Sequence, residues 1–337
     1  MSQQQYDVAG LGNAIVDIIA SVDDRFLLTH RIAKGGMALV DEFRAKELLR
    51  ALADGNQALS SLHEIAGGSA ANTMAGLASL GGNGVYVGKV FDDRLGMVFA
   101  KSMSAQGITF TTHPTRVGST TASCVIAVTP DGQRSMNTYL GAAREFATGD
   151  VNEADIAGSE VLYIEGYLWD APEAKAASLK AIEIAKCAGT KVAFTLSDPF
   201  LMGRYRGEFL ALLKDLDILF ANEDEAKALF EVEEFDDVLQ AFKPMNKIAA
   251  LTRSEKGCVV VRGAEVHVVD AAPVERVIDT TGAGDQFAAG FMYGLTHGKG
   301  LADCGRLGAL AAAEVISHYG ARPEVSLKDM AVKAGLI

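Results

Sequence analysis

The second half of the chain alternates between short apolar runs and longer segments with helical spacing. Near-continuous apolar runs at 161–166, 191–196, 217–221 and 248–252 predict buried strands, and the Ala-rich stretch 172–188 predicts a helix between the first two. Strands that are apolar on both faces and separated by helices are typical of a parallel sheet with helices on both sides. The pattern therefore predicts an α/β fold with a doubly wound, mostly parallel sheet sandwiched by helices.

Residues 107–140 carry a different pattern, in which Thr-rich segments alternate between polar and apolar positions. Three segments predict consecutive antiparallel strands: 108–112, 120–128 and 134–139. A hairpin turn is expected at Asp131-Gly132, between the last two. Together with about 14–20 and 34–42, these strands predict a small β-sheet lid inserted in a single domain that spans 1–337.

The sequence Asp-Thr-Thr-Gly-Ala-Gly-Asp at 279–285 leads directly into a stretch with helical apolar spacing. Thr280 or Thr281 is expected to cap this helix. The small residues Gly282, Ala283 and Gly284 would let backbone N–H groups approach a ligand closely, at the positive end of the helix dipole. This stretch therefore predicts an anion site.

Asp285 follows the predicted anion site immediately. A carboxylate beside a phosphate is electrostatically unfavourable, so its presence there indicates a function. The obvious function is to accept the proton of a hydroxyl that attacks the phosphate. The alternative is a Gly-rich turn before an ordinary helix, with Asp285 favourable in the first helical turn. A longer motif is needed to decide between the two.

Charge and cysteine usage exclude several classes of protein. The formal net charge of −12 argues against a nucleic-acid or anionic-membrane surface, which would need clustered Lys and Arg. The four cysteines are scattered and form no Cys-x-x-Cys, so neither a zinc site nor a disulfide framework is indicated. Residues 1–5 carry no basic start and no apolar core of a signal peptide, so a reduced cytoplasm is the expected location.

Two nucleotide-binding motifs can be tested directly against the chain. Gly10-Leu11-Gly12 suggests a dinucleotide fold, but the third glycine of that fingerprint would fall at Ile15. No Gly-x-x-x-x-Gly-Lys-Ser/Thr occurs anywhere in the sequence. An NAD-binding oxidoreductase therefore remains only as a less favoured alternative.

Polar residues that stand at or just after the predicted strands are expected to converge on one edge of the sheet. They are Asp17, Glu165, Asp198, Asn222 and Thr252. In parallel α/β sheets, ligands bind beyond the carboxyl ends of the strands. The positions of these residues along the chain therefore predict a ligand site at this edge of the sheet.

A second small-residue loop occurs at Gly67-Gly68-Ser69, before an Ala-rich helix that contains Asn72. Two glycines and a Ser at a helix start again allow close approach of a ligand, although an ordinary helix entry is the alternative. Taken with 279–285, the pair of loops resembles the two signatures of the PfkB carbohydrate and nucleoside kinase family, the ribokinase-like fold. The resemblance covers nearly the whole chain.

The resemblance implies roles for individual residues. Asp285 is the implied base, with the amides of Gly282, Ala283 and Gly284 as its anion site. The sugar-like ring would be bound by Asn13, Asp17, Gly67, Gly68 and Asn72. Arg134, which could also be a solvated strand charge, would reach the transferring phosphate as the lid closes, and closure would exclude water.

The donor side follows from the same resemblance. Asn222 and Glu225 are implied to order Mg²⁺ and phosphate through water, although helix capping is their alternative. Thr252, Ser254 and Gly257 match the family's nucleotide loop, with Ser254 in place of its first Gly. The implied cofactors are ATP and Mg²⁺, and Asp279 and Thr281 could hold K⁺ through their backbone.

The expected activity is transfer of the γ-phosphate of ATP to the 5′-hydroxyl of a nucleoside, adenosine being converted to AMP. Lys-Gly-Gly-Met-Ala-Leu at 34–39 and the lid hairpin resemble adenosine-kinase-type members, and Met37, Phe110 and Cys124 would form an apolar face for a purine. Ribokinase-like or fructokinase-like sugar kinases and a non-catalytic nucleoside-binding regulator are the alternatives. The expected partners are small molecules, and the chain is expected to be a monomer or homodimer.

Overall fold

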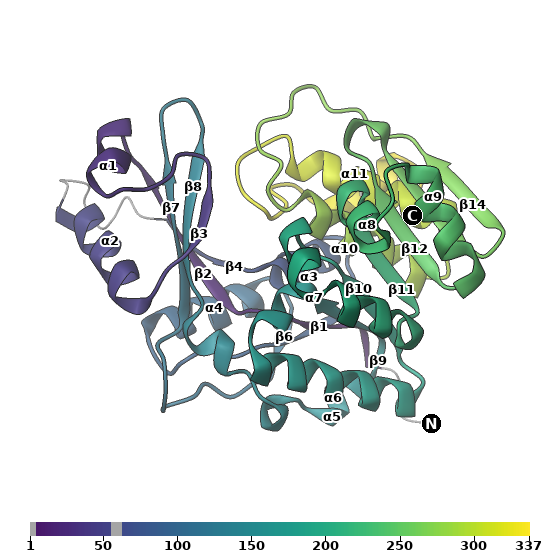
Figure 1. Cartoon of the computed structure of the whole chain (residues 1–337), viewed down its shortest axis with the longest axis horizontal. Coiled ribbons are helices and arrows are strands. Elements are labelled where there is room, and N and C mark those ends of the chain that lie inside the picture. The colour runs from purple at the N-terminus through teal and green to yellow at the C-terminus, as the bar shows by residue number, and fades with distance from the viewer. Residues whose placement is uncertain (1–4, 55–62) are drawn as a thin grey trace.

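A nine-stranded sheet forms the centre of the structure (Figure 1). The computed structural model describes residues 5–54 and 63–337. In spatial order the strands are β14 (Glu265–Val269), β13 (Cys258–Arg262), β12 (Ile248–Thr252), β11 (Ile218–Asn222), β10 (Lys191–Thr195), β9 (Ser159–Glu165), β1 (Tyr6–Leu11), β5 (Gly84–Val87) and β6 (Thr109–Phe110). Pairing is parallel from β6 to β12 and antiparallel for β13 and β14.

Helices cover both faces of this sheet because its strands are apolar on both sides. One core packs against α3 (Ser69–Ser79), α4 (Arg94–Ala105), α10 (Ala283–Thr296), α11 (Leu301–Val315) and α12 (Leu327–Lys333). The other core packs against α5 (Glu153–Ala157), α6 (Pro172–Ala188), α7 (Pro199–Leu212), α8 (Glu223–Phe230) and α9 (Phe235–Phe242). The predicted doubly wound α/β architecture is confirmed.

A second, five-stranded sheet stands beside the first (Figure 1). Its order is β3 (Met37–Leu39), β8 (Arg134–Tyr139), β7 (Ala122–Val128), β2 (Ile15–Ser21) and β4 (His63–Gly67). Two helices, α1 (Asp24–Thr29) and α2 (Glu42–Asp54), lie on its outer side, where Leu48 and Leu52 pack against Ala20 and Val125. The expected hairpin at Asp131-Gly132 is confirmed, since β7 and β8 are antiparallel.

The second sheet differs from the prediction in two strands. Thr109–Phe110 is not part of it: the segment pairs in parallel with Val85 and Tyr86 at the edge of the large sheet. Its aromatic ring explains this, because Phe110 packs against Tyr86 and Phe99 at centroid distances of 5.8 and 5.4 Å. His63–Gly67, which the sequence did not suggest as a strand, pairs with β2 instead.

Among residues 5–54 and 63–337, none of the helices has the combination of length and apolar composition that crossing a bilayer requires.

Candidate active site

A cavity of about 450 Å³ collects residues from both sheets and from the start of α10. The second sheet supplies an apolar wall from Ile15, Met37, Leu39, Cys124, Ile126 and Met136, and Leu140, directly after β8, continues it. The strand ends of the large sheet supply polar groups: Glu165, Thr195, Ser197, Asp198, Asn222 and Thr252. The carboxyl edge of the parallel strands and the second sheet therefore enclose one space, as the positions of the polar residues predicted.

The loop before α10 presents its backbone to this cavity. Gly282 caps the helix with φ 79°, and no side chain caps it. A Cβ on Gly282 would lie 2.7 Å from the Cα of Ala321, so only glycine fits between the two backbones. Gly282, Ala283 and Gly284 all line the cavity, and amides in the first helical turn have no partner within the helix.

The expected Thr cap is wrong. The N–H and the hydroxyl of Thr281 both donate to Asp279 Oδ1, at 3.0 and 2.6 Å. Because that hydroxyl is engaged within the loop and the N-cap position belongs to Gly282, no side chain caps the helix. The N–H of Ala283 donates to the carbonyl oxygen of Thr280 at 3.2 Å, whereas the N–H groups of Gly282 and Gly284 have no partner among the described residues. An uncapped N-terminus that lines a cavity is a ready anion site.

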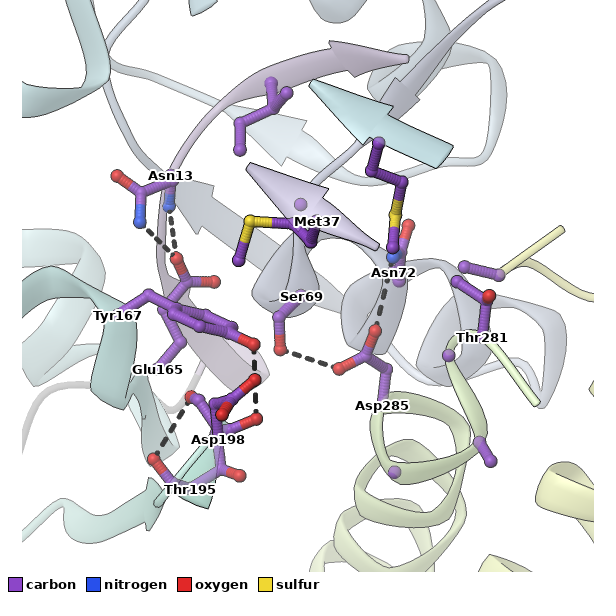
Figure 2. Close-up of a pocket in the computed structure, with 18 of the residues that line it drawn as sticks. Asn13, Met37, Ser69, Asn72, Glu165, Tyr167, Thr195, Asp198, Thr281 and Asp285 are labelled. Carbon is purple, nitrogen blue, oxygen red and sulfur yellow. Dashed lines mark hydrogen bonds between the residues drawn. The ribbon is translucent and has the colours of Figure 1, made fainter. Parts of the chain in front are cut away.

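Asp285 lies at the wall of the cavity, opposite the start of α3 (Figure 2). Its Oδ1 accepts a hydrogen bond from Ser69 Oγ at 2.6 Å, and its Oδ2 accepts one from Asn72 Nδ2 at 3.2 Å. Burial raises the pKa of Asp285 to about 6, while these two hydrogen bonds and the charge of Arg322 act in the opposite direction. The carboxylate is therefore ionised at neutral pH but basic enough to take a proton.

Asp17 lines the same cavity from β2. Burial raises its pKa to about 6, opposed by the charges of Arg322 and Arg134. Gly67 leaves room for this carboxylate, because a Cβ there would come within 2.3 Å of Asp17 Oδ2. Gly67 itself does not line the cavity, so its role in the structure is to leave space for the side chain of Asp17.

Asn13 and the buried Glu165, which both line the cavity, form a polar cluster (Figure 2). Glu165 Oε1 accepts hydrogen bonds from the N–H and Nδ2 of Asn13 at 2.8 and 2.7 Å, and Oε2 accepts one from the N–H of Ala70 at 2.8 Å. Burial raises the pKa of Glu165 to about 7 against these bonds. Glu165 thus ties the β1–β2 turn to the start of α3.

Gly68 and Asn72 lie where α3 begins, and both line the cavity. Gly68 has φ 93°, and a Cβ on it would lie 2.2 Å from the carbonyl oxygen of Asn13. Asn72 is engaged at both amide atoms, since Nδ2 donates to Asp285 and Oδ1 accepts from Arg322 Nε at 3.1 Å. One N–H of its amide group is left for a ligand.

The apolar face expected from Met37, Phe110 and Cys124 is present only in part. Met37 and Cys124 line the cavity. The placement of Phe110 is wrong: its ring is packed under the large sheet, as described above. Met136 and Ile126 from the hairpin strands complete the apolar wall in its stead.

Arg134 is not a solvated strand charge. Its guanidinium pairs with Asp279 Oδ2, and the two side chains are only 10% and 9% exposed. Burial raises the pKa of Asp279, but the hydrogen bonds from Thr281 and Gly320 and the charge of Arg134 hold it below its ordinary value. The pair lies behind the anion loop rather than in the cavity wall, and it joins the second sheet to that loop.

Asn222 and Glu225 form a capping box at the start of α8. Asn222 Oδ1 accepts from the N–H of Glu225 at 2.8 Å, and Glu225 accepts from the N–H and Nδ2 of Asn222, both at 2.9 Å. Burial raises the pKa of Glu225 to about 7. The capping interpretation is therefore correct, and both residues also line the cavity.

The predicted nucleotide loop lies next to Asn222, because Thr252 is its register partner on β12. Thr252 lines the cavity, whereas Ser254 and Gly257 lie outside it. Ser254 has φ 52° and Gly257 has φ 78°. The serine thus takes up the left-handed conformation that a glycine adopts easily.

Sequence reasoning missed two groups around Asp285. Ser69 was noted only as a helix start, yet its hydroxyl bonds the carboxylate of Asp285, 216 positions away. Arg322 was not noted at all, and it reaches Asn72 across 250 positions. A single basic residue in a loop carries no periodicity or spacing, so no signal in the sequence could have found it.

Known proteins share this architecture over nearly the whole chain. The profile of the pfkB family carbohydrate kinases matches residues 30–327. The crystal structure of adenosine kinase from Sinorhizobium meliloti is 50% identical, covers 98% of this chain and 99% of that chain, and gives a TM-score of 0.88. The structure of a probable sugar kinase protein from Rhizobium etli CFN 42 is 46% identical, covers 99% and 100% of the two chains, and gives a TM-score of 0.90.

A more distant relative is adenosine kinase 1 of Arabidopsis thaliana, which is 28% identical over 345 residues, or 95% of this chain and 97% of the relative. Several plant fructokinases match over about two thirds of this chain, among them fructokinase-1 of Oryza sativa at 67%. The family profile covers far more than half of the sequence, and both signature loops meet at one cavity. The chain therefore belongs to the pfkB family of carbohydrate kinases, which are phosphotransferases that act on an alcohol group.

Proposed function

We propose that the chain is an adenosine kinase, which transfers the γ-phosphate of ATP to the 5′-hydroxyl of adenosine to give AMP and ADP. Relatives named adenosine kinase match nearly the full chain, one of them at 50% identity. The observation that carries the proposal is that an uncapped helix start, a carboxylate of raised pKa and an apolar wall share one cavity.

The apolar wall supports a nucleoside over a bare sugar. Met37 and Leu39 are 44% and 53% exposed although both line the cavity. Exposed apolar side chains that face a cavity gain free energy when a flat apolar ligand covers them. A purine base has two such flat faces, whereas a pentose or hexose carries hydroxyls around its ring and has smaller apolar faces.

In the proposed mechanism the chain's own residues hold the alcohol next to both the acceptor of its proton and the phosphate that it attacks. Asp17 and the remaining N–H of Asn72 hold the ribose hydroxyls. Asp285 takes the proton of the 5′-hydroxyl as that oxygen bonds the γ-phosphorus and the bond to the β-phosphate oxygen breaks. The amides of Gly282, Ala283 and Gly284 stabilise the charge on the transferred group.

Asn222 and Glu225 fit a water-mediated contact to Mg²⁺ that ATP brings with it. Both oxygens of Glu225 already accept hydrogen bonds from Asn222, so the carboxylate is arranged to hold a hydrated ion rather than to replace its waters. Mg²⁺ supplies charge neutralisation between the phosphates when it is bound. Thr252, with the turn through Ser254 and Gly257, is proposed to lie along the nucleotide.

Activation by K⁺ is part of the same proposal. The backbone carbonyls of Asp279 and Thr281 accept no hydrogen bond within the described residues, and free carbonyl oxygens are the ligands that a hard monovalent cation takes. Replacing K⁺ by a bulky organic cation in the assay is expected to lower the turnover rate. An unchanged rate would remove K⁺ from the proposal.

A phosphoryl-transfer assay tests the proposed function. The purified chain with ATP and Mg²⁺ is offered adenosine, other nucleosides, ribose and fructose, and ADP release is measured. Adenosine is expected to give the highest kcat/KM. A preference for fructose or ribose would make it a sugar kinase, nucleoside binding without turnover would make it a regulator, and binding of NAD would favour the oxidoreductase.

A further inference from the structure

The loop between α11 and α12 places one arginine behind the candidate base. Arg322 Nε donates to Asn72 Oδ1 at 3.1 Å, and its Nη1 donates to Ser102 Oγ on α4 at 3.2 Å. Asn72 in turn donates through Nδ2 to Asp285 Oδ2 at 3.2 Å. A continuous chain of hydrogen bonds therefore runs from the guanidinium to the carboxylate.

The chemistry of this chain fixes its direction. A guanidinium can only donate hydrogen bonds, so the atom of Asn72 that faces Arg322 must be the amide oxygen. The amide nitrogen then necessarily faces Asp285, whose ionised carboxylate can only accept. If the amide were turned around, an N–H group would face a cation and an oxygen would face an anion.

The backbone holds the same residues from the other side. Gln286 Nε2 donates to the carbonyl oxygens of Asn72 and of Ala321, both at 2.9 Å. The residue after Asp285 thus ties α3 to the residue before Arg322. These two bonds do not involve the side chain of Arg322 and remain when it is replaced, so the change is expected to act first on the side chain of Asn72.

We propose that Arg322 is a positioning residue for Asp285, which orients the Asn72 amide and keeps the carboxylate ionised. The proposal rests on the assignment of Asp285 as the base. Arg322 does not line the cavity, so its effect passes through Asn72 and through its charge. Burial lowers the pKa of Arg322 to about 10, which still leaves it positively charged at neutral pH.

The effect of the Arg322 charge on Asp285 must be distinguished from the effects of other titratable groups nearby. Tyr163 and Glu165 of β9 and the neighbouring Tyr167 all interact with its charge. Asp17 lies near Arg322 from β2. None of these four groups lowers the pKa of Asp285 by its charge, whereas Arg322 does. Removing it is expected to raise the pKa of Asp285 and also that of Asp17, which the charge of Arg322 lowers as well. The test therefore reads the carboxyl group of Asp285 itself.

The test compares Arg322→Met, Arg322→Gln and Arg322→Lys. The pKa of Asp285 is measured in the resting protein from its ¹³C carboxyl resonance, which is assigned by its absence in Asp285→Asn. Met and Gln, which carry no charge, are expected to raise this pKa by about one pH unit. Lys keeps the positive charge and can only donate hydrogen bonds, so Arg322→Lys is expected to restore most of the wild-type pKa of Asp285.

Kinetics give a second readout. A rise of about one unit from a pKa near 6 lowers the ionised fraction of the base about fivefold at pH 6 and hardly at all at pH 8. We expect kcat in Arg322→Met to follow that pattern with the KM for ATP unchanged. Arg206→Met, which removes an arginine bonded to the Leu229 carbonyl 2.8 Å away, is the matched control and should show no pH-dependent loss.

Three results would overturn the proposal. They are an unshifted Asp285 resonance in folded Arg322→Met and Arg322→Gln, a loss of rate that is equal at pH 6 and pH 8, or a Lys variant that resembles Met. The resonance needs no turnover, so failure of the adenosine kinase activity in the wild type would be seen separately. If Met does not fold, the comparison of Gln with Lys decides.

Discussion

Two carboxylates with raised pKa values line the same cavity, Asp17 from β2 and Asp285 from α10, and their hydrogen-bond partners indicate different roles. Asp285 accepts hydrogen bonds from Ser69 and Asn72 and lies at the anion loop. Asp17 accepts none from the described residues, so both of its oxygens remain free for ligand hydroxyls. At the residue scale, the hydrogen bonds that each carboxylate already accepts distinguish the proposed base, Asp285, from the proposed sugar-binding residue, Asp17.

Replacement of Asp285 by Asn should remove the proton acceptor while keeping the shape of the side chain. We expect kcat to fall by about three orders of magnitude, with ATP binding by calorimetry retained. Asp17→Asn is the matched control, and it should mainly raise the KM for adenosine. Near-normal turnover in Asp285→Asn would contradict the assignment of the base.

The residues that the sequence predicted and those that it did not differ in a physical way. Asp285 and Gly282 stand in one contiguous string, whose loop-to-helix character is a local property of the chain. Arg322 and Ser69 act through partners more than 200 positions away, and nothing local in the sequence marks such contacts. Phe110 shows the same limit, because a short strand with alternating polarity fits the edge of either sheet.

At the scale of single elements, the site depends on how α3 and α10 begin. Both helices start at a glycine with positive φ, Gly68 and Gly282, and neither glycine position has a side-chain cap. At each start an added Cβ would collide with backbone from a distant segment. The sequence predicted both loops as close-approach sites, but it misassigned the cap of α10 because Thr281 has an alternative partner in Asp279.

A pair of glycine variants in one loop tests this geometry. Gly282→Ala forces a left-handed conformation on alanine, at a cost of about 1–2 kcal/mol, and adds a clash with Ala321. It should lower both the thermal midpoint and kcat. Gly284→Ala has open space around its Cβ and should leave the midpoint unchanged or slightly higher. Equal midpoints for the two variants would refute the packing argument.

At the scale of the whole molecule, the active site exists only where the two sheets face one another. The doubly wound sheet could be predicted because its strands are continuously apolar. The membership of the second sheet could be predicted only in part, because its strands come from four separated regions of the chain. Arg134 and Asp279 form a buried ion pair that joins this sheet to the anion loop.

Arg134→Ala should leave the Asp279 carboxylate buried without its cation. Breaking one side of a buried pair costs roughly 3 kcal/mol, so the free energy of unfolding in urea should fall by about that amount, and kcat should fall as the anion loop loosens. Asp279→Asn added to Arg134→Ala should restore part of the lost stability. Unchanged kinetics in Arg134→Ala would show that the pair serves folding alone.

The buried carboxyl groups also give the whole molecule a characteristic dependence on pH. Folding raises the pKa of Asp17 and Asp285 to about 6 and of Glu165 and Glu225 to about 7. The folded state therefore binds more protons than the unfolded state above about pH 4, so stability is full below the unfolded pKa values and is lost as the pH rises through the folded ones. Glu223 has a pKa lowered to about 2 in the folded state, so its contribution to stability changes with pH only below its unfolded pKa and stays constant at neutral pH.

We therefore expect the ligand-free protein to have a higher thermal midpoint at pH 6 than at pH 8. A group with a folded pKa near 7 contributes about 1 kcal/mol to this difference, so Glu165→Gln should make the dependence shallower. Calorimetry at several pH values measures both, and Glu160→Gln, at a partly exposed position of the same strand, serves as the control. A midpoint that rises with pH would mean that these carboxyl groups are ionised more easily in the folded protein than their burial implies.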